Sequence, residues 1–215
     1  MTLTELDGIK LHGSMDRPYG FSYAAWTTKW WEWIMPFTNE KSPLNDYNGE
    51  GWDRDQPSSN VWFLIGNFAK QYKSPYKDFP QRRIKRMPAG RSILFPVLNC
   101  MSTFLEDKEK LGYETHDDLL GHVRRDVDSV VKKEVFINYK RYEPARIQTE
   151  PRIFKVSINE DNAFEIKNSG ITEAAAEGYW VFLKPLSKGH YSIRFEGSCE
   201  NGRLSAGASY ELDIV

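Results

Sequence analysis

The end of the chain carries the strongest structural signal in the sequence. Residues 178–183 are aromatic and β-branched, and the Lys184-Pro185 step ends this stretch. In residues 190–196 apolar and polar side chains alternate, which is the pattern of a half-buried strand. Residues 210–214 alternate in the same way, after an Asn201-Gly202 pair that is typical of hairpin turns. Three strands joined by short turns indicate a sandwich or barrel.

We therefore predict a mainly β protein, an immunoglobulin-like antiparallel β-sandwich with two accessory helices. Residues 1–20 are interpreted as an N-terminal tail that could hold a short strand at residues 9–12, and residues 21–215 as a single sandwich domain with helical additions. A chain of 215 residues is long enough to bury a sizeable core in one domain. Pro96 indicates an edge or a bulge in one of the remaining strands. Those strands are expected at residues 61–65, 92–98, 135–139 and 152–158.

Two helices are expected. The first begins at Ser22, a good N-cap, and its aromatic residues follow a 3.6-residue period as far as Phe37, although Pro36 is expected to end the helix. The second begins at Thr115, which forms a variant of the capping box with Asp118, and its apolar face runs to Val131. Residues 38–60, 66–91 and 102–114 are expected to be mostly loop, and residues 172–177 are compatible with a helical turn.

The first helix has an aromatic face, and two interpretations of it stay open. The helix could plug the sandwich, with the aromatic side chains in the core, or it could be a stacking platform for sugars or bases. Trp31 lies off this face and neither interpretation explains it.

Composition and charge exclude several classes of protein. The net charge of −1 provides no general attraction to nucleic acid or to anionic membranes. No run of residues is long and apolar enough to span a bilayer. The first residues lack the basic and apolar segments of a signal peptide, so a cytoplasmic location is expected. Cys100 and Cys199 allow at most one disulfide and no disulfide framework.

An acidic segment at residues 46–55 resembles the first half of a calcium loop. Oxygen ligands fall at alternate positions and a Gly occupies the sixth, but Pro57 stands where a bidentate Glu would be needed. A run of solvated Asx turns is the alternative. A metal-assisted or hydrolase-type enzyme, with calcium as the one candidate cofactor, would use this segment. Its candidate ligands are Asp46, Asn48, Asp53 and Asp55.

A basic segment follows at residues 70–91. Eight Lys and Arg residues against Asp78 alone give a local charge of 8 − 1, or +7, with aromatic residues between them. Basic and stacking side chains together are what single-stranded nucleic acid requires. The charges could equally be solvated, or paired with the acidic segment, and the near-neutral chain makes nucleic acid an improbable partner. The candidate anion-binding residues are Arg82, Arg83, Lys85 and Arg86.

The sequence contains no catalytic motif of known spacing. Nucleophile elbows, phosphate loops and dinucleotide fingerprints are absent. No two histidines have the spacing of a helical zinc site. The histidines are His12, His116, His122 and His190.

Asn99 is a candidate pocket residue, because a polar side chain at the end of a buried strand can line a binding site. The alternative is that Asn99 forms a turn. The residues expected to line a pocket with it are Trp52, Gln56 and Trp62. The leading hypothesis is therefore a non-catalytic β-sandwich protein that binds a small molecule or a protein partner, and self-association stays open.

Several stretches together resemble an uncharacterised family of mostly bacterial, often exported proteins. They are YAAWTTKWWEW (residues 23–33), Gln56 with VWFLIG (61–66), PAGRSILFPVLN (88–99) and GYWVFLKPLSKGHYSIRF (178–195). The resemblance implies no particular activity. Members of the family often carry a Cys near the position of Trp52 and another near that of Lys85. This chain has neither, so the resemblance implies that no disulfide joins these loops here.

Overall fold

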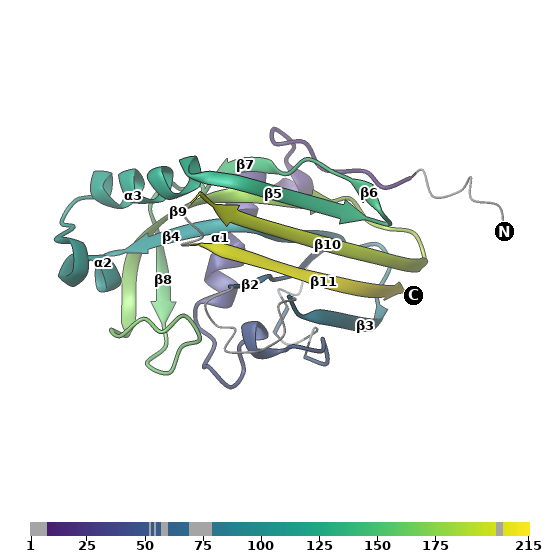
Figure 1. Cartoon of the computed structure of the whole chain (residues 1–215), viewed down its shortest axis with the longest axis horizontal. Helices are drawn as coiled ribbons and strands as arrows, with labels where there is room; N and C mark the ends of the chain where they lie inside the picture. Colours follow the sequence, from purple (N-terminus) through teal and green to yellow (C-terminus); the bar gives the residue numbers. More distant parts are fainter. Residues whose placement is uncertain (1–7, 52, 54, 57–59, 69–78, 201–203) are drawn as a thin grey trace.

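A computed structural model describes residues 8–51, 53, 55–56, 60–68, 79–200 and 204–215. The fold is mainly β and consists of two sheets packed face to face, with three α-helices among the described residues (Figure 1). The predicted sandwich architecture is confirmed at this level. None of the described helices combines the length and the apolar composition that a bilayer crossing requires.

Sheet A is built around two long strands, β4 (Ser92–Thr103) and β9 (Gly170–Leu183), which pair antiparallel. β1 (Val61–Phe63) lies parallel to β4. β7 (Ala145–Gln148) and β8 (Phe154–Ile158) both pair with β9. The register of β4 shifts between Pro96 and Leu98, so the bulge predicted from Pro96 is confirmed.

Sheet B contains the predicted C-terminal strands. β10 (Gly189–Cys199) and β11 (Ser205–Ile214) form an antiparallel pair, and β5 (Val130–Ile137) pairs with the other edge of β10. The turn predicted at Asn201-Gly202 lies outside the described residues. The edges are formed by β6 (Lys140–Arg141), β2 (Asn67–Phe68) and β3 (Gln81–Met87).

The core between the sheets is aromatic at its centre. The rings of Phe95 and Phe195 stack with their centroids 4.7 Å apart, and Phe195 stacks on Tyr210 at 6.3 Å. Near the end of β10 the two sheets approach closely. A Cβ atom placed on Gly197 would lie 2.6 Å from Leu98 Cβ, so this position requires glycine.

The helix α1 (Tyr23–Ile34) covers the outer face of sheet A and adds a third layer. Ser22 caps it by accepting a hydrogen bond from the backbone N–H of Ala25, at 3.0 Å. Trp30 is 2% exposed, packs edge-to-face on Trp180 of β9, and donates its indole N–H to Leu64 O at 3.0 Å. The core interpretation of most of the aromatic face is therefore confirmed.

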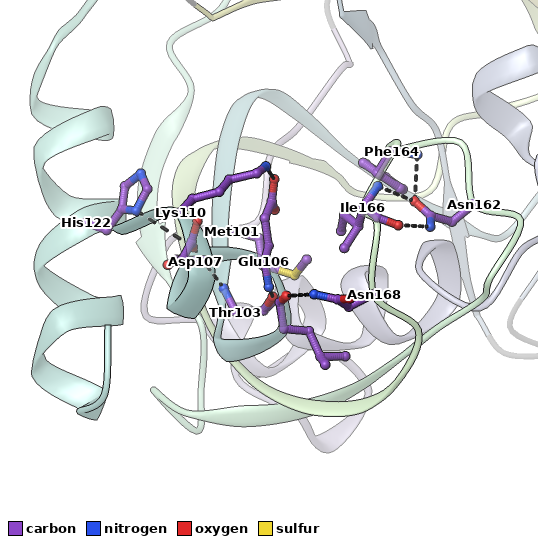
Figure 2. Close-up of polar contacts among 12 residues, drawn as sticks. Met101, Thr103, Glu106, Asp107, Lys110, His122, Asn162, Phe164, Ile166 and Asn168 are labelled. Carbon is purple, nitrogen blue, oxygen red and sulfur yellow. Dashed lines mark hydrogen bonds and ion pairs between the residues drawn. The ribbon is translucent and has the colours of Figure 1, made fainter. Parts of the chain in front are cut away.

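Trp31 is also buried, because the loop before β9 packs against it in addition to the core residues. Its ring lies 6.4 Å from that of Phe164 in this loop. Asn162 holds the loop in shape by accepting hydrogen bonds from the N–H groups of Phe164 and Ile166, each at 3.1 Å (Figure 2). Asn168 attaches the loop to the next helix through Leu105 O at 2.9 Å. The 3.6-residue period identifies a helix with one buried face, so it cannot reveal the additional contact between Trp31 and the loop before β9.

Two further helices, α2 (Phe104–Leu111) and α3 (His116–Asp128), lie at the far end of β4 and β9 (Figure 1). The predicted capping box of Thr115 and Asp118 is present. Leu119 and Val123 pack on Ala175 of β9, where the small side chain leaves room for a helix. The helix was predicted to continue to Val131, but it ends at Asp128 and the chain turns directly into β5.

The structure corrects four other expectations. Both sheets are mixed, because β1–β4 and β3–β11 are parallel pairs. Residues 104–111 form a third helix, the segment 66–91 contains β2 and β3, and residues 172–177 belong to β9. The short strand indicated at residues 9–12 of the tail does pair with sheet A, since Leu11 bridges Leu183, His12 N donates to Phe182 O and Lys184 N to Lys10 O, each at 2.8 Å. Two 3₁₀ turns, Pro18–Gly20 and Pro43–Asn45, complete the described elements.

Candidate functional site

The residues predicted to form one pocket are separated in the structure. Trp62 is 4% exposed and belongs to the core between the sheets, with the Arg91 guanidinium 5.1 Å from its ring centroid. Asn99 lines a cavity of about 10 Å³ beside Trp30, enough for a single water molecule. Trp52 lies outside the described residues.

Gln56 acts as an extension of the sheet edge. Its side-chain amide donates to Phe63 O at 2.9 Å and accepts from Phe63 N at 2.8 Å, as a neighbouring strand would. It borders a different cavity, of about 20 Å³. Asn99 and Gln56 therefore have separate local roles, and neither lines a space that could hold an organic ligand.

The acidic segment forms turns that occupy two of its four candidate metal ligands, Asp46 and Asn48. The Asp46 carboxylate accepts hydrogen bonds from the backbone N–H groups of Gly49, Glu50 and Gly51 at 2.9, 3.1 and 3.0 Å. Asn48 Oδ1 also accepts from Glu50 N, at 3.1 Å. In the part of the chain that the structure describes, no three His, Cys, Asp or Glu residues are placed to hold a metal ion. Asp53 and Asp55 are exposed. The geometry supports the Asx-turn interpretation of this segment.

Arg82 does not lie on a basic loop, as the sequence suggested, but in the interior. It is 2% exposed on β3, and its guanidinium donates to Asp46 O at 2.6 Å, Ile65 O at 2.8 Å and Tyr210 Oη at 3.0 Å. Asn67 Oδ1 accepts a further hydrogen bond from it. Through these hydrogen bonds Arg82 connects the acidic segment and β2 with Tyr210 of β11. It is therefore unavailable to an external anion, and the prediction for this residue is wrong.

The other predicted anion-binding residues, Arg83, Lys85 and Arg86, are exposed on β3. Arg83 lies 3.8 Å from Asp213 on the neighbouring strand. Charged side chains on an edge strand also protect it from pairing with other chains. Polyanion binding stays a prediction that rests on these three residues.

The histidines make separate contacts. His190 lies between two carboxylates of β11, with Nε2 2.7 Å from Glu211 and Nδ1 2.8 Å from Asp213. The hydrogen bond to Asp213, with Glu211 in support, raises the pKa of His190. Burial, with Lys184 nearby, lowers the pKa of His12. His116 lies 2.9 Å from Glu173.

A pocket of about 380 Å³ opens at the C-terminal end of α1. Its walls include Trp33, Pro36 and Phe37, and Lys41 and Asp55 lie at the same opening. Trp33 packs edge-to-face on Phe63 of β1 and on Phe37, with ring centroids 5.4 and 5.8 Å apart. The indole N–H of Trp33 is buried and has no acceptor among the described residues.

The sequence placed Trp33 and Phe37 in the aromatic face of the helix but did not separate them from the core. For Phe37 the signal was Pro36, because a proline ends the helical period and turns the residues beyond it away from the buried face. The helix in fact ends at Ile34, and both aromatic residues are half-buried at the surface.

Comparison with protein-family models, with curated protein sequences and with solved structures finds no match to this chain.

Proposed function

We propose that the protein is a non-catalytic binding protein whose ligand pocket lies at the C-terminal end of α1. The supporting observation is that Trp33 and Phe37 wall an opening of about 380 Å³ outside the core. This volume is in the range of small-molecule sites, which typically combine apolar walls with a few polar groups. The packing of Trp33 on β1 keeps its ring in place, so little ordering is required on binding.

The lining favours a neutral ligand with a flat apolar face and hydroxyl groups, such as a sugar ring. Aromatic side chains stack on such a face, and Thr38, Lys41 and Asp55 provide donors and acceptors at the opening. The lining includes one ammonium and one carboxylate, so no single charge sign dominates.

Screening by thermal shift with monosaccharides, disaccharides and nucleosides, followed by calorimetry, tests this function. Phe37→Ala should weaken binding about tenfold, a loss of about 1.4 kcal/mol, because it removes one wall of the pocket. Phe21→Ala is the matched control, since Phe21 is another partly exposed aromatic residue, near the N-terminal end of α1. No binding by any of these compounds, or an equal loss in both variants, would refute the proposal.

We also propose that the sandwich is of the immunoglobulin-like type. The support for this is that two sheets stack on each other, with β9 in sheet A and β10 and β11 in sheet B. An experimental structure with a sugar from the screen would test the fold and the pocket together.

A further inference from the structure

The two cysteines of the chain lie on strands that belong to different sheets. Cys100 is part of β4 in sheet A, and Cys199 is the last residue of β10 in sheet B. Figure 1 shows that both strands run toward the end of the molecule that carries α2 and α3. The sequence contains no other cysteine, and both thiols are free in this structure. A disulfide bond within one chain can therefore join only these two residues.

The two sheets approach each other closely just before the cysteines. A Cβ atom placed on Gly197 would lie 2.6 Å from Leu98 Cβ. The two Cβ atoms of a disulfide are about 3.5–4.5 Å apart, so β4 and β10 are near enough here to be bridged. Cys100 and Cys199 each follow two residues later, and residues two apart in a strand point to the same face. Both cysteine side chains therefore extend into the space between these two strands.

Asp126 of α3 contacts both thiols. Cys100 Sγ donates to Asp126 Oδ2 at 3.3 Å, and Cys199 Sγ donates to Asp126 O at 3.5 Å. Nε2 of His122 lies 3.3 Å from the same carboxylate oxygen. The two sulfur atoms are thus both within hydrogen-bonding distance of a single residue, at the same end of the sandwich.

A pocket of about 390 Å³ gives access to one of the two thiols. Cys199 lines it together with Tyr113, Arg125 and Ser129, whereas Cys100 does not. Cys199 is only 6% exposed, so a reagent that reaches its sulfur atom must be small. Hydrogen peroxide meets this condition. The pocket shares no lining residue with the aromatic pocket on α1, so this site is independent of the proposed function.

We propose that Cys100 and Cys199 form a reversible disulfide bond when hydrogen peroxide enters this pocket. The sulfur of Cys199 attacks one peroxide oxygen and breaks the O–O bond, which leaves a sulfenic acid on Cys199 and releases water. The sulfur of Cys100 then attacks the sulfur of Cys199, breaks its S–O bond and releases a second water molecule. The two thiols give up two protons and two electrons, which reduce the peroxide to the two water molecules.

The environment of each thiol decides the order of these steps. Burial, followed by the charge of Asp126, raises the pKa of the Cys100 thiol, and the nearby Cys199 adds to this effect. Cys100 is therefore protonated and poorly nucleophilic before the peroxide reacts. Cys199, which the pocket reaches, is oxidised first. The alternative is that both cysteines act only as small apolar residues of the interior.

Peptide mapping by mass spectrometry without reduction tests the proposal. Treatment of the folded protein with hydrogen peroxide should yield a pair of peptides that joins Cys100 to Cys199, and dithiothreitol should separate them. Because the bridge closes a loop of about 100 residues, it should raise the melting temperature by about 5 °C or more.

The two single-cysteine variants are matched controls for each other. Cys100→Ser should retain a sulfenic acid on Cys199, which dimedone labels, whereas Cys199→Ser should keep Cys100 as a thiol. The mapped bridge in the unaltered protein decides if a variant does not fold. The proposal is wrong if both thiols survive peroxide in the folded protein, if bridges join only separate chains, or if the bridge fails to raise the melting temperature. Dimedone labelling of Cys100 in Cys199→Ser would also overturn it.

Discussion

Neighbouring residues of β3 with the same side-chain chemistry have opposite roles. Arg82 is 2% exposed and its partners among the described residues are neutral oxygens, whereas the side chain of Arg83 is 63% exposed and lies near one carboxylate. A guanidinium without a counter-ion is tolerated in the interior only if its N–H groups find acceptors. The position in the strand, rather than the residue type, decides which arginine is structural.

Replacing Arg82 by Met should destabilise the protein by about 2–4 kcal/mol, because it leaves several buried carbonyl oxygens without donors. Arg83→Met is the matched control and should cost less than about 1 kcal/mol, as is usual for an exposed ion pair. Urea denaturation of the two variants measures the difference. Equal stabilities would show that the Arg82 network contributes nothing.

His190 makes a pH-dependent contribution to sheet B. Its folded pKa is raised above the usual 6.5, so its contribution to stability is complete below pH 6.5 and is lost as the pH rises through the folded pKa. The ring is exposed, so solvent screens the effect and the change in stability is small. NMR titration should give a pKa above 6.5 for His190 and a lower one in Asp213→Asn. A titration at or below 6.5 in the unaltered protein would contradict the geometry.

At the scale of elements, glycine is required where the backbones of two strands approach too closely for a side chain. Gly197 of β10 faces the backbone of β4, and an added Cβ would lie 2.9 Å from Val97 O as well as against Leu98. Gly121 of α3 has only the flexible end of Arg125 near it, at 3.2 Å. Gly197 therefore permits the two sheets to pack, whereas Gly121 has no such role and lowers the stability of α3.

Gly197→Ala should destabilise the fold by about 1–3 kcal/mol through overpacking between two backbones. Gly121→Ala should instead stabilise it by about 0.5–1 kcal/mol, because alanine favours the helix and Arg125 can move aside. Thermal unfolding of both variants gives the signs directly. Stabilisation by Gly197→Ala would mean that the sheets have room to separate.

The elements that the sequence predicted well are those with one buried face. Period-two alternation located β10 and β11, and the capping residues located the starts of α1 and α3. β3 was missed because its charged side chains conceal the alternation, although Arg82 and Ile84 both point inward. The end of α3 was missed because Val130 and Val131 continue the apolar pattern while the chain changes to a strand.

For the whole molecule, β9 is the strand that joins the layers. Its alternate residues serve two cores, since Trp180 and Phe182 pack toward α1 while Val181 and Leu183 pack toward sheet B. Sequence patterns identify a strand buried on both faces but cannot say which partners cover each face.

Because β9 is shared, the helical layer and the sandwich should unfold together. Tryptophan fluorescence reports mainly the α1 layer, and far-UV circular dichroism reports mainly the sheets. The two thermal transitions should coincide, as expected for a cooperative domain. A fluorescence transition several degrees below the other would show that α1 detaches first.

The bulge in β4 has a consequence for natural and engineered variation. Before it, Phe95 and Val97 face sheet B, and after it Leu98 and Cys100 face the same side. Deleting Val97 would restore strict alternation and leave the pairing of every later residue with β9 unchanged. Deleting Asn99 instead would exchange the environments of every later side chain of the strand. Ser102 would then turn away from Asp107, and Met101 would leave the α1 layer. Length changes beyond the bulge should thus be selected against more strongly than most substitutions, so related chains that differ in length across β4 should differ at the bulge itself.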